Sequence, residues 1–145
     1  MKRVLITFLF TFIGFSSIFA QEWQTDLSTA KEIAKKEKKP IVLVFQGSDW
    51  CGPCIKLDHE VWSTAEFKEY SKDHFVMLKA DFPKRNKNAL SKEQQDRNNA
   101  LAEKYNKNGY FPFVVVLNAK GEVKGTTGYK KMAPAQFQKL LSSYN

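Results

Sequence analysis

Three continuous apolar runs along the chain have the composition of strands that are buried on both faces of a sheet. They cover residues 41–45, 75–80 and 113–117. In three other segments apolar residues recur at every third or fourth position, which is typical of helices that pack against a sheet. These segments cover residues 27–39, 91–106 and 134–144. Together with a weaker edge strand at 122–126, the pattern predicts a single α/β domain.

The region between the first two strands predicts two short helices. Cys54, Leu57 and Val61 fall on one face of the first helix. Residues 63–66 match a capping box, which predicts the start of the second helix. Because a strand, helices and a strand in succession form a crossover connection, the two strands that flank these helices should be parallel.

Residues 1–20 have the three parts of a secretory signal peptide. A basic start precedes an apolar stretch at 4–13, and small residues lead up to Ala20. We predict cleavage after Ala20, export to the periplasm or out of the cell, and a mature domain at 21–145. The alternative is an uncleaved membrane anchor, but so short an apolar segment barely spans about 30 Å of hydrocarbon.

The composition excludes several classes of protein. The 145 residues are 43% hydrophobic, which is too apolar for a disordered chain, and no apolar run suits a multi-spanning membrane protein. The net charge is +8, and residues 83–109 carry seven cations against three acids. No aromatic side chains interleave with these cations as a stacking platform requires, so we do not expect nucleic-acid binding. The segment can steer an acidic partner, although a solvated helix face explains it as well.

Both cysteines of the chain lie in Cys51-Gly-Pro-Cys54, at the junction between a strand and a helix. A purely structural disulfide is a poor explanation, because closing so small a ring stabilises a fold by only roughly 2 kcal/mol. A zinc site would need His59 and His74 as further ligands, and their spacing does not match the usual zinc motifs. We expect both histidines at the surface, and we expect neither a metal nor a cofactor.

The position of the two cysteines favours redox chemistry. Cys51 falls at the N-terminus of a helix, where free backbone N–H groups stabilise an anion and should lower its pKa below the usual value of about 8.5. Pro53 suits the first helical turn. Cys54 comes one turn later on the core-facing side and should be buried. We therefore expect an exposed Cys51 to be the nucleophile and Cys54 the resolving thiol, with Trp50 beside the reactive sulfur.

Trp50–Cys54 after a buried strand, together with Tyr110-Phe111-Pro112 before another, resembles the thioredoxin family. The likeness extends over about residues 22–145 and implies a thioredoxin fold, with a central mixed sheet of four to five strands and helices on both faces. In this family the proline that matches Pro112 is cis and faces the dithiol, and the backbone of the preceding residue pairs with the substrate. The resemblance implies a set of substrate-contacting residues: Trp50, Gly52, Pro53, Phe111 and Pro112.

Gly47–Cys51, with Lys56 and Glu60–Trp62, is more specifically similar to exported thioredoxin-like proteins. These resemble the periplasmic C-terminal domain of a membrane electron transporter that keeps disulfide-exchange proteins reduced. The resemblance implies disulfide-containing client proteins as substrates and a membrane protein as the electron donor. We expect the chain to act as a monomer.

Two positions depart from the thioredoxin pattern. Phe45 stands where cytosolic thioredoxins have a buried Asp, and Met77 stands where they usually have a Lys on the neighbouring strand. The acceptor for the proton of Cys54 is therefore not in its usual place. The candidates are Asp49, Asp58, Asp81 and a water molecule.

These observations predict an exported thiol–disulfide oxidoreductase. The Gly-Pro pair between the cysteines resembles reducing members of the family, near about −270 mV, more than oxidants near about −120 mV. The alternative is a binding or chaperone-like module that uses the groove at Pro112 and in which the dithiol is incidental. A thiol peroxidase is a weaker third possibility, because a peroxide-reducing Cys usually lacks a partner Cys three residues away.

Overall fold

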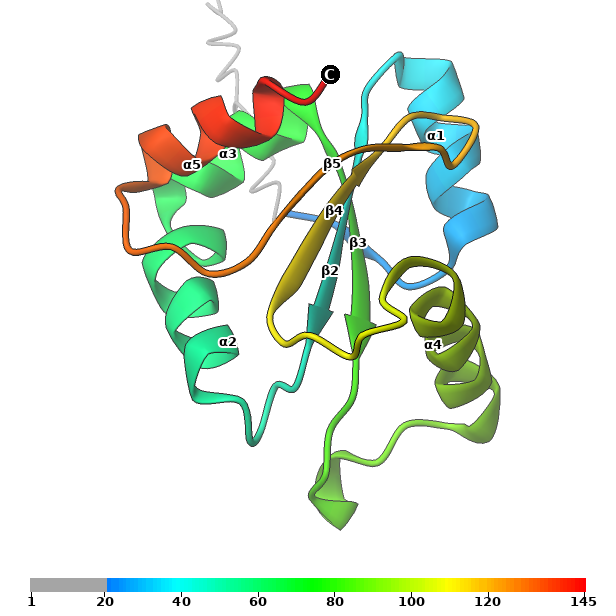
Figure 1. Ribbon diagram of the computed structural model, residues 1–145. Coiled ribbons are helices and arrows are strands. Elements are labelled where there is room, and N and C mark those ends of the chain that lie inside the picture. Colours follow the sequence, from blue (N-terminus) through cyan, green and yellow to red (C-terminus); the bar gives the residue numbers. More distant parts are fainter. Residues whose placement is uncertain (1–20) are drawn as a thin grey trace, which may run out of the picture.

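A mixed five-stranded sheet forms the centre of the computed structural model, which describes residues 21–145 (Figure 1). Its strands are β1 (Trp23–Gln24), β2 (Ile41–Gln46), β3 (Val76–Asp81), β4 (Phe113–Leu117) and β5 (Val123–Thr127). They lie in the order β1-β3-β2-β4-β5. β3 runs parallel to β1 and β2, whereas β4 runs antiparallel to β2 and β5. The predicted mixed sheet and the parallel pairing of β2 and β3 are confirmed. The predicted signal peptide lies outside the described residues.

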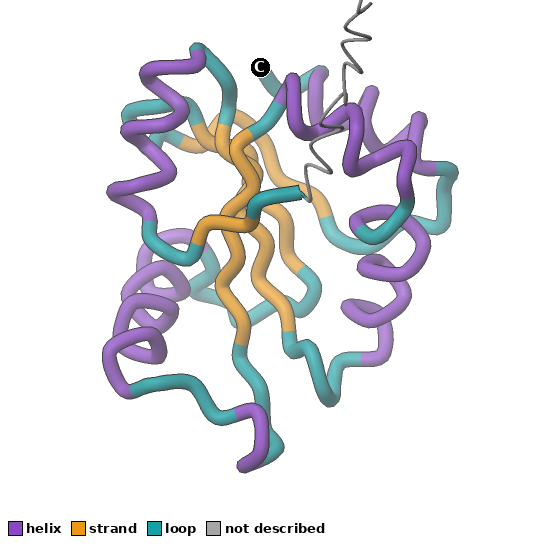
Figure 2. Tube along the Cα trace, turned by 180° about the vertical axis from the view of Figure 1, so that it is seen from behind, coloured by secondary structure: helices purple, strands orange, loops and turns teal. Residues whose placement is uncertain are grey.

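Helices cover both faces of the sheet, as Figures 1 and 2 show from opposite sides. One face carries α2 (Gly52–Leu57), the π-helical turn η1 (Asp58–Trp62), α3 (Ala65–His74) and α5 (Pro134–Ser142). The other face carries α1 (Leu27–Glu37) and α4 (Lys92–Tyr105). A short 3₁₀ turn, η2 (Asn86–Asn88), lies between β3 and α4. Within residues 21–145, no helix has the length and apolar character needed to cross a membrane.

The side chains of β2 divide the core into two clusters. Val42 and Val44 face α2, α3 and α5, where they join a cluster that contains Trp62. Leu43 and Phe45 face α1 and α4 and join the second cluster. All six residues of β2 are buried, and the first five, residues 41–45, form an uninterrupted apolar run, as expected of a strand covered on both faces. β2 is therefore a rigid base for the segment that follows it, which carries both cysteines.

The second helix on this face begins one residue later than the capping box predicted. Ser63 keeps helical backbone angles (φ −85°, ψ −6°), whereas Thr64 is extended (φ −70°, ψ 144°). Only an extended residue can turn its side chain back onto the first helical turn, so Thr64 is the N-cap. The N–H of Phe67 donates to Thr64 Oγ1 at 3.2 Å, and Ser63 Oγ donates instead to Asp58 at 2.9 Å.

Candidate active site

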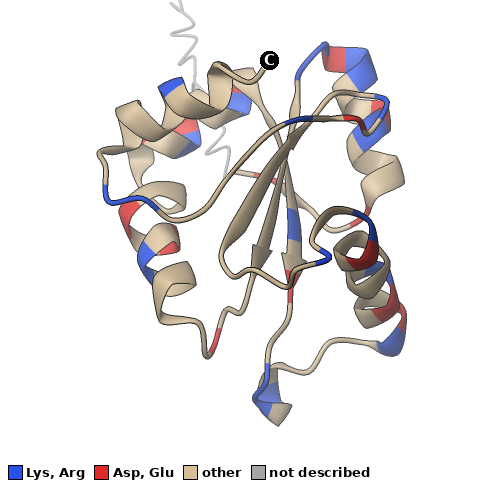
Figure 3. Ribbon diagram, viewed as in Figure 1, with Lys and Arg blue, Asp and Glu red and all other residues tan. Residues whose placement is uncertain are grey.

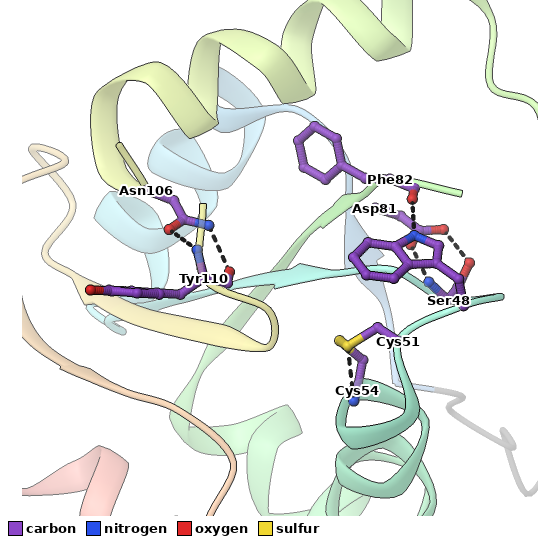
Figure 4. The surroundings of a disulfide bond; sticks show 8 residues. Ser48, Cys51, Cys54, Asp81, Phe82, Asn106 and Tyr110 are labelled. Atoms are coloured by element: carbon purple, nitrogen blue, oxygen red, sulfur yellow. Dashed lines mark hydrogen bonds between the residues drawn. A yellow bond between two sulfur atoms is a disulfide. The ribbon is translucent and has the colours of Figure 1, made fainter. Parts of the chain in front are cut away.

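Cys51 and Cys54 form a disulfide at the start of α2, immediately after the turn that leaves β2 (Figure 4). Cys51 is the N-cap of α2, and the N–H of Cys54 donates to Cys51 Sγ at 3.3 Å. Pro53 lies in the first turn, where its missing N–H costs no hydrogen bond. A backbone N–H therefore points at the sulfur of Cys51 and can stabilise a thiolate there after reduction.

Both cysteines are buried in the disulfide form. Cys54 is 3% exposed, as its core-facing position predicted. The expectation that Cys51 is exposed is wrong for this form, because its side chain is only 4% exposed. Its Sγ is bonded to Cys54 and faces the segment that carries Tyr110, as Figure 4 shows. Gly52 is exposed, and a side chain at this position would meet no atom within 4 Å, so the disulfide can be approached over Gly52.

Trp50 forms one wall beside the disulfide. Its indole N–H donates to the carbonyl of Phe82 at 2.7 Å, and its ring lies 5.5 Å from the ring of Phe111, edge to face. The indole also packs directly on Gly47, where an added Cβ would come within 2.3 Å of a ring atom. Gly47 is thus needed for this orientation of Trp50, although 39% of the Trp50 surface remains exposed to an incoming partner.

The segment before β4 contacts Trp50 and faces the disulfide. The Phe111–Pro112 peptide bond is cis, and Pro112 is buried. Asn106, at the end of α4, holds this segment, because its side-chain amide donates to the carbonyl of Tyr110 at 2.8 Å and accepts from the N–H of Tyr110 at 2.9 Å (Figure 4). Sequence reasoning missed Asn106. The sequence feature that could have indicated this role is an Asn at the end of a helix, four residues before the exposed Tyr110.

The two departures from the thioredoxin pattern lie on different faces of the sheet. Phe45 belongs to the cluster under α1 and α4, with its ring 6.3 Å from that of Phe113. Met77 belongs to the cluster on the α2 face, and it pairs in register with Val42. Met77 does not lie beside Phe45, because the parallel register pairs Phe45 with Ala80. Neither Phe45, Met77 nor Ala80 can accept a proton.

Of the three candidate carboxylates, only Asp58 shares a cavity with Cys54. This cavity has a volume of about 100 Å³, and its lining is Gln46, Ser48, Cys54, Ile55 and Asp58. Asp81 is engaged elsewhere, because both of its oxygens accept hydrogen bonds from Ser48, at 2.9 and 2.6 Å. Gln46 is buried at 8% exposure at the end of β2, and sequence reasoning missed it because it follows a purely apolar run.

The carboxylate of Asp49 is instead hydrogen-bonded to the segment that follows β3. It accepts hydrogen bonds from the N–H of Lys84 at 2.9 Å, the side-chain amide of Asn88 at 2.8 Å and the N–H of Arg85 at 3.0 Å. These bonds, that of Lys84 most of all, together with the charge of Arg85, lower the pKa of Asp49 against the opposing effect of partial burial. A carboxylate held in this way is a poor proton acceptor.

Replacing Asp49 with Asn should change how stability depends on pH. Because the pKa of Asp49 is lowered on folding, the charged group stabilises the fold fully above its unfolded value of about 3.9, and the effect is lost as pH falls through the lower folded value. We expect wild type to be the more stable at neutral pH and the two proteins to converge in acid. Urea unfolding over the acid range measures this; a constant gap down to the lowest pH would contradict it.

The two histidines lie at the surface, as predicted. His59 and His74 are both exposed, and His74 Nδ1 lies 2.7 Å from the carbonyl oxygen of Tyr70. In the part of the chain from 21 to 145, no group of three or more His, Cys, Asp or Glu side chains is arranged to hold a metal ion. The site itself consists of the two sulfurs and the polar groups around them.

Comparison with known proteins agrees with this chemistry. A thioredoxin-like family model matches residues 22–119. The disulfide bond reductase DsbH of Chlamydia pneumoniae is 34% identical over 122 residues, which cover 84% of this chain and 71% of that protein. A solved structure of a DsbH oxidoreductase is 32% identical, covers 87% of this chain and 85% of its own, and superposes with a TM-score of 0.79.

A more distant structure shares the fold alone. The C-terminal domain of Neisseria meningitidis DsbD in the oxidised form is 20% identical, with 82% of this chain and 90% of that domain covered and a TM-score of 0.53. The predicted thioredoxin fold is thus confirmed. With a Cys51–Cys54 pair at the start of α2 and these relatives, the chain belongs to the thioredoxin-like family and is a thiol–disulfide oxidoreductase.

Proposed function

We propose that this protein is an exported disulfide reductase that transfers electrons from Cys51 and Cys54 to disulfides of client proteins. The observation that carries the proposal is the placement of Cys51 as the N-cap of α2, with the N–H of Cys54 at 3.3 Å from its sulfur. The free backbone N–H groups of the first helical turn stabilise a thiolate at this position. The name of the related disulfide bond reductase supports the reducing direction.

The reaction proceeds in two thiol–disulfide exchanges. The Cys51 thiolate attacks one sulfur of the client disulfide, which forms a mixed disulfide and releases the first client thiolate. The Cys54 thiolate then attacks Cys51 Sγ, which forms the Cys51–Cys54 disulfide and releases the second client thiolate. The client gains two electrons and the protein loses two, so the structure represents the oxidised product of one cycle. Both sulfurs are covered in the disulfide form, and the first attack is assigned to Cys51 because Cys51 is the N-cap of α2.

Five residues around the disulfide are proposed to contact the client: Trp50, Gly52, Pro53, Phe111 and Pro112. Trp50 and Phe111 form a continuous aromatic edge, since their rings lie 5.5 Å apart. Gly52 and Pro53 are exposed beside the disulfide and leave room for a client main chain. The backbone of Phe111, ahead of Pro112, would pair with an extended client segment, in the way that the thioredoxin resemblance implies. These contacts would orient the client disulfide toward Cys51.

Asp58 is the proposed acceptor for the proton of Cys54. The two residues are one helical turn apart, and the N–H of Asp58 donates to the carbonyl of Cys54. Their shared cavity of about 100 Å³ has room for water, which needs roughly 10–15 Å³. Asp58 also lines a second, larger cavity of about 280 Å³ with Lys68 and Lys79. A proton from the Cys54 thiol can thus pass through water to Asp58 and on to solvent.

Replacing Asp58 with Asn should slow the second exchange by about ten- to a hundredfold at neutral pH, because the amide cannot accept the proton. The deficit should shrink as pH rises and the thiol ionises into solvent without help. Stopped-flow release of a chromophoric thiol from a mixed disulfide on Cys51 measures the rate. Asp73→Asn, on the exposed side of α3, is the matched control. An Asp58→Asn protein with the wild-type rate and pH profile would contradict this role.

Export and electron supply complete the proposal. An N-terminal signal peptide at 1–20 would deliver a monomer to the periplasm or outside the cell, where disulfides persist. A reductant in that compartment must be reduced again after each cycle, and a membrane electron donor would do so. The reduction potential of the Cys51–Cys54 pair, measured by equilibration with dithiothreitol, tests the direction. We expect a value of about −270 mV; a value of about −120 mV would make the protein an oxidant.

A further inference from the structure

The seven cations of residues 83–109 differ in their partners. On α4, Lys92 lies 2.6 Å from Asp96 and Arg97 lies 2.8 Å from Glu93, so acids on the same helix neutralise these cations. The connection between β3 and α4, residues 82–91, contains three cations and no acid, and we call it the basic loop. Its cations Lys84, Arg85 and Lys87 are all exposed. Across residues 21–145, none of these three takes part in an ion pair.

The basic loop is fixed beside the disulfide. Asp49 accepts hydrogen bonds from two backbone N–H groups and one amide of this loop, as described above. Trp50 donates to the carbonyl of Phe82, and Lys84 Nζ lies 3.9 Å from the centre of the indole ring. Because Asp49 and Trp50 directly precede Cys51, these contacts tie the loop to the site. Figure 3 shows the loop as a blue projection beyond the ends of β2 and β3.

The surroundings of the disulfide combine apolar and basic surface. The described residues include four large apolar side chains that are strongly exposed, and three of them, Trp50, Ile55 and Tyr110, lie next to the site in sequence. One acid of the site, Asp58, lies one turn after Cys54. The two others, Asp49 and Asp81, lie nearer the loop, and the carboxylate of Asp49 offsets part of its positive charge. Three exposed cations still outnumber these two carboxylates, both of which are already hydrogen-bonded.

We infer that the basic loop binds acidic residues of the client polypeptide that lie close to the disulfide being reduced. The inference rests on the proposed function and adds a substrate class to it. At physiological salt, charges act over about 8 Å, so the recognised acids must come within about this distance of the loop cations. Such charges at the rim of an interface raise the association rate more than they change the chemical step. Selectivity therefore appears in kcat/KM and not in kcat.

Three disulfide peptides of equal length, with acidic, neutral or basic residues beside the cysteines, test the inference. We expect wild type to prefer the acidic peptide, with the basic peptide the poorest substrate. Arg85→Gln with Lys87→Gln should lower kcat/KM for the acidic peptide by about three- to tenfold and leave the neutral peptide unchanged. Lys84 is retained because it contacts Trp50. Raising the salt to about 1 M, where charges act over about 3 Å, should remove the preference.

The matched control replaces Lys35 and Lys36 with Gln. Both are exposed near the end of α1, which leads into the start of β2, whereas the disulfide follows the other end of β2 (Figure 1). This control removes the same charge and should keep the wild-type preference. If the control lost its preference for the acidic peptide as much as the Arg85/Lys87 variant does, the effect would come from net charge. That result would overturn the inference.

Other outcomes separate the inference from the proposed function. If wild type reduces all three peptides equally well, the proposed function stands and the inference falls. If it reduces none, both fall. Sedimentation with vesicles of phosphatidylserine and phosphatidylcholine tests a lipid surface as the occupant. Vesicle binding that needs Arg85 and Lys87, without any preference among the peptides, would overturn the inference in favour of a membrane.

Discussion

Replacing Cys51 with Ser should abolish disulfide reduction, with a loss of at least about a thousandfold in turnover, because the hydroxyl is not a nucleophile at neutral pH. The fold should survive the change. Cys51 is the N-cap of α2, and its sulfur accepts the N–H of Cys54. Ser is among the best N-cap residues and can accept the same hydrogen bond. Turnover of insulin disulfides with dithiothreitol as reductant measures the loss, and circular dichroism checks the fold.

This variant also separates the enzyme from the alternative of a binding module. A module that uses the groove at Pro112 would bind its client equally well after both Cys51 and Cys54 are replaced by Ser. An enzyme that holds its client mainly through the mixed disulfide would lose most of the complex. Activity that persists in Cys51→Ser would refute the central role of this residue.

Replacing Cys54 with Ser should stop the cycle after the first exchange. Cys51 keeps its position and its access to the client, so it still forms the mixed disulfide. Cys54 is buried at 3% exposure and supplies the second sulfur, so its loss leaves the client covalently attached. Mass spectrometry after incubation with a disulfide peptide should show one peptide bound per protein, with catalytic turnover lost.

The matched control for this trap is the Cys51→Ser protein, which retains Cys54. Its remaining thiol, Cys54, does not occupy the N-cap position of α2 and should bind no peptide. A peptide adduct on Cys51→Ser, or its absence on Cys54→Ser, would reverse the two assigned roles.

Most elements could be predicted from the sequence, including the exposed edge strand β5, whereas the very short strand β1 could not. β2 and β4 are almost entirely buried and therefore appear as uninterrupted apolar runs. β1 has two residues and is partly exposed, so it carries no pattern of its own and exists through its pairing with β3. The capping box was misplaced by one residue because the π-helical turn η1 extends the preceding helix. That extension depends on packing rather than on local sequence.

The reactive part of the site lies within one short stretch of sequence and was therefore predictable. The residues that position it come from distant parts of the chain and were not. The dithiol and its N-cap position follow from four consecutive residues. The contacts of Asp49 join residues 35–39 positions apart, and only the folded chain brings them together. Gln46 shares a cavity with Cys54 because the alternation of β2 directs it toward α2. The low exposure of Cys51 depends on the bond to Cys54 and on the distant segment at Tyr110.

The rate at which iodoacetamide alkylates Cys51 in the reduced protein, followed against pH, is the most direct measurement. Peptide mapping assigns the label to Cys51 or Cys54, so the profile reports the one sulfur that a helix N-terminus should ionise. We predict a midpoint clearly below the value of about 8.5 for a free thiol, and rapid reaction at neutral pH. A midpoint at or above that value, with slow alkylation at neutral pH, would contradict the account.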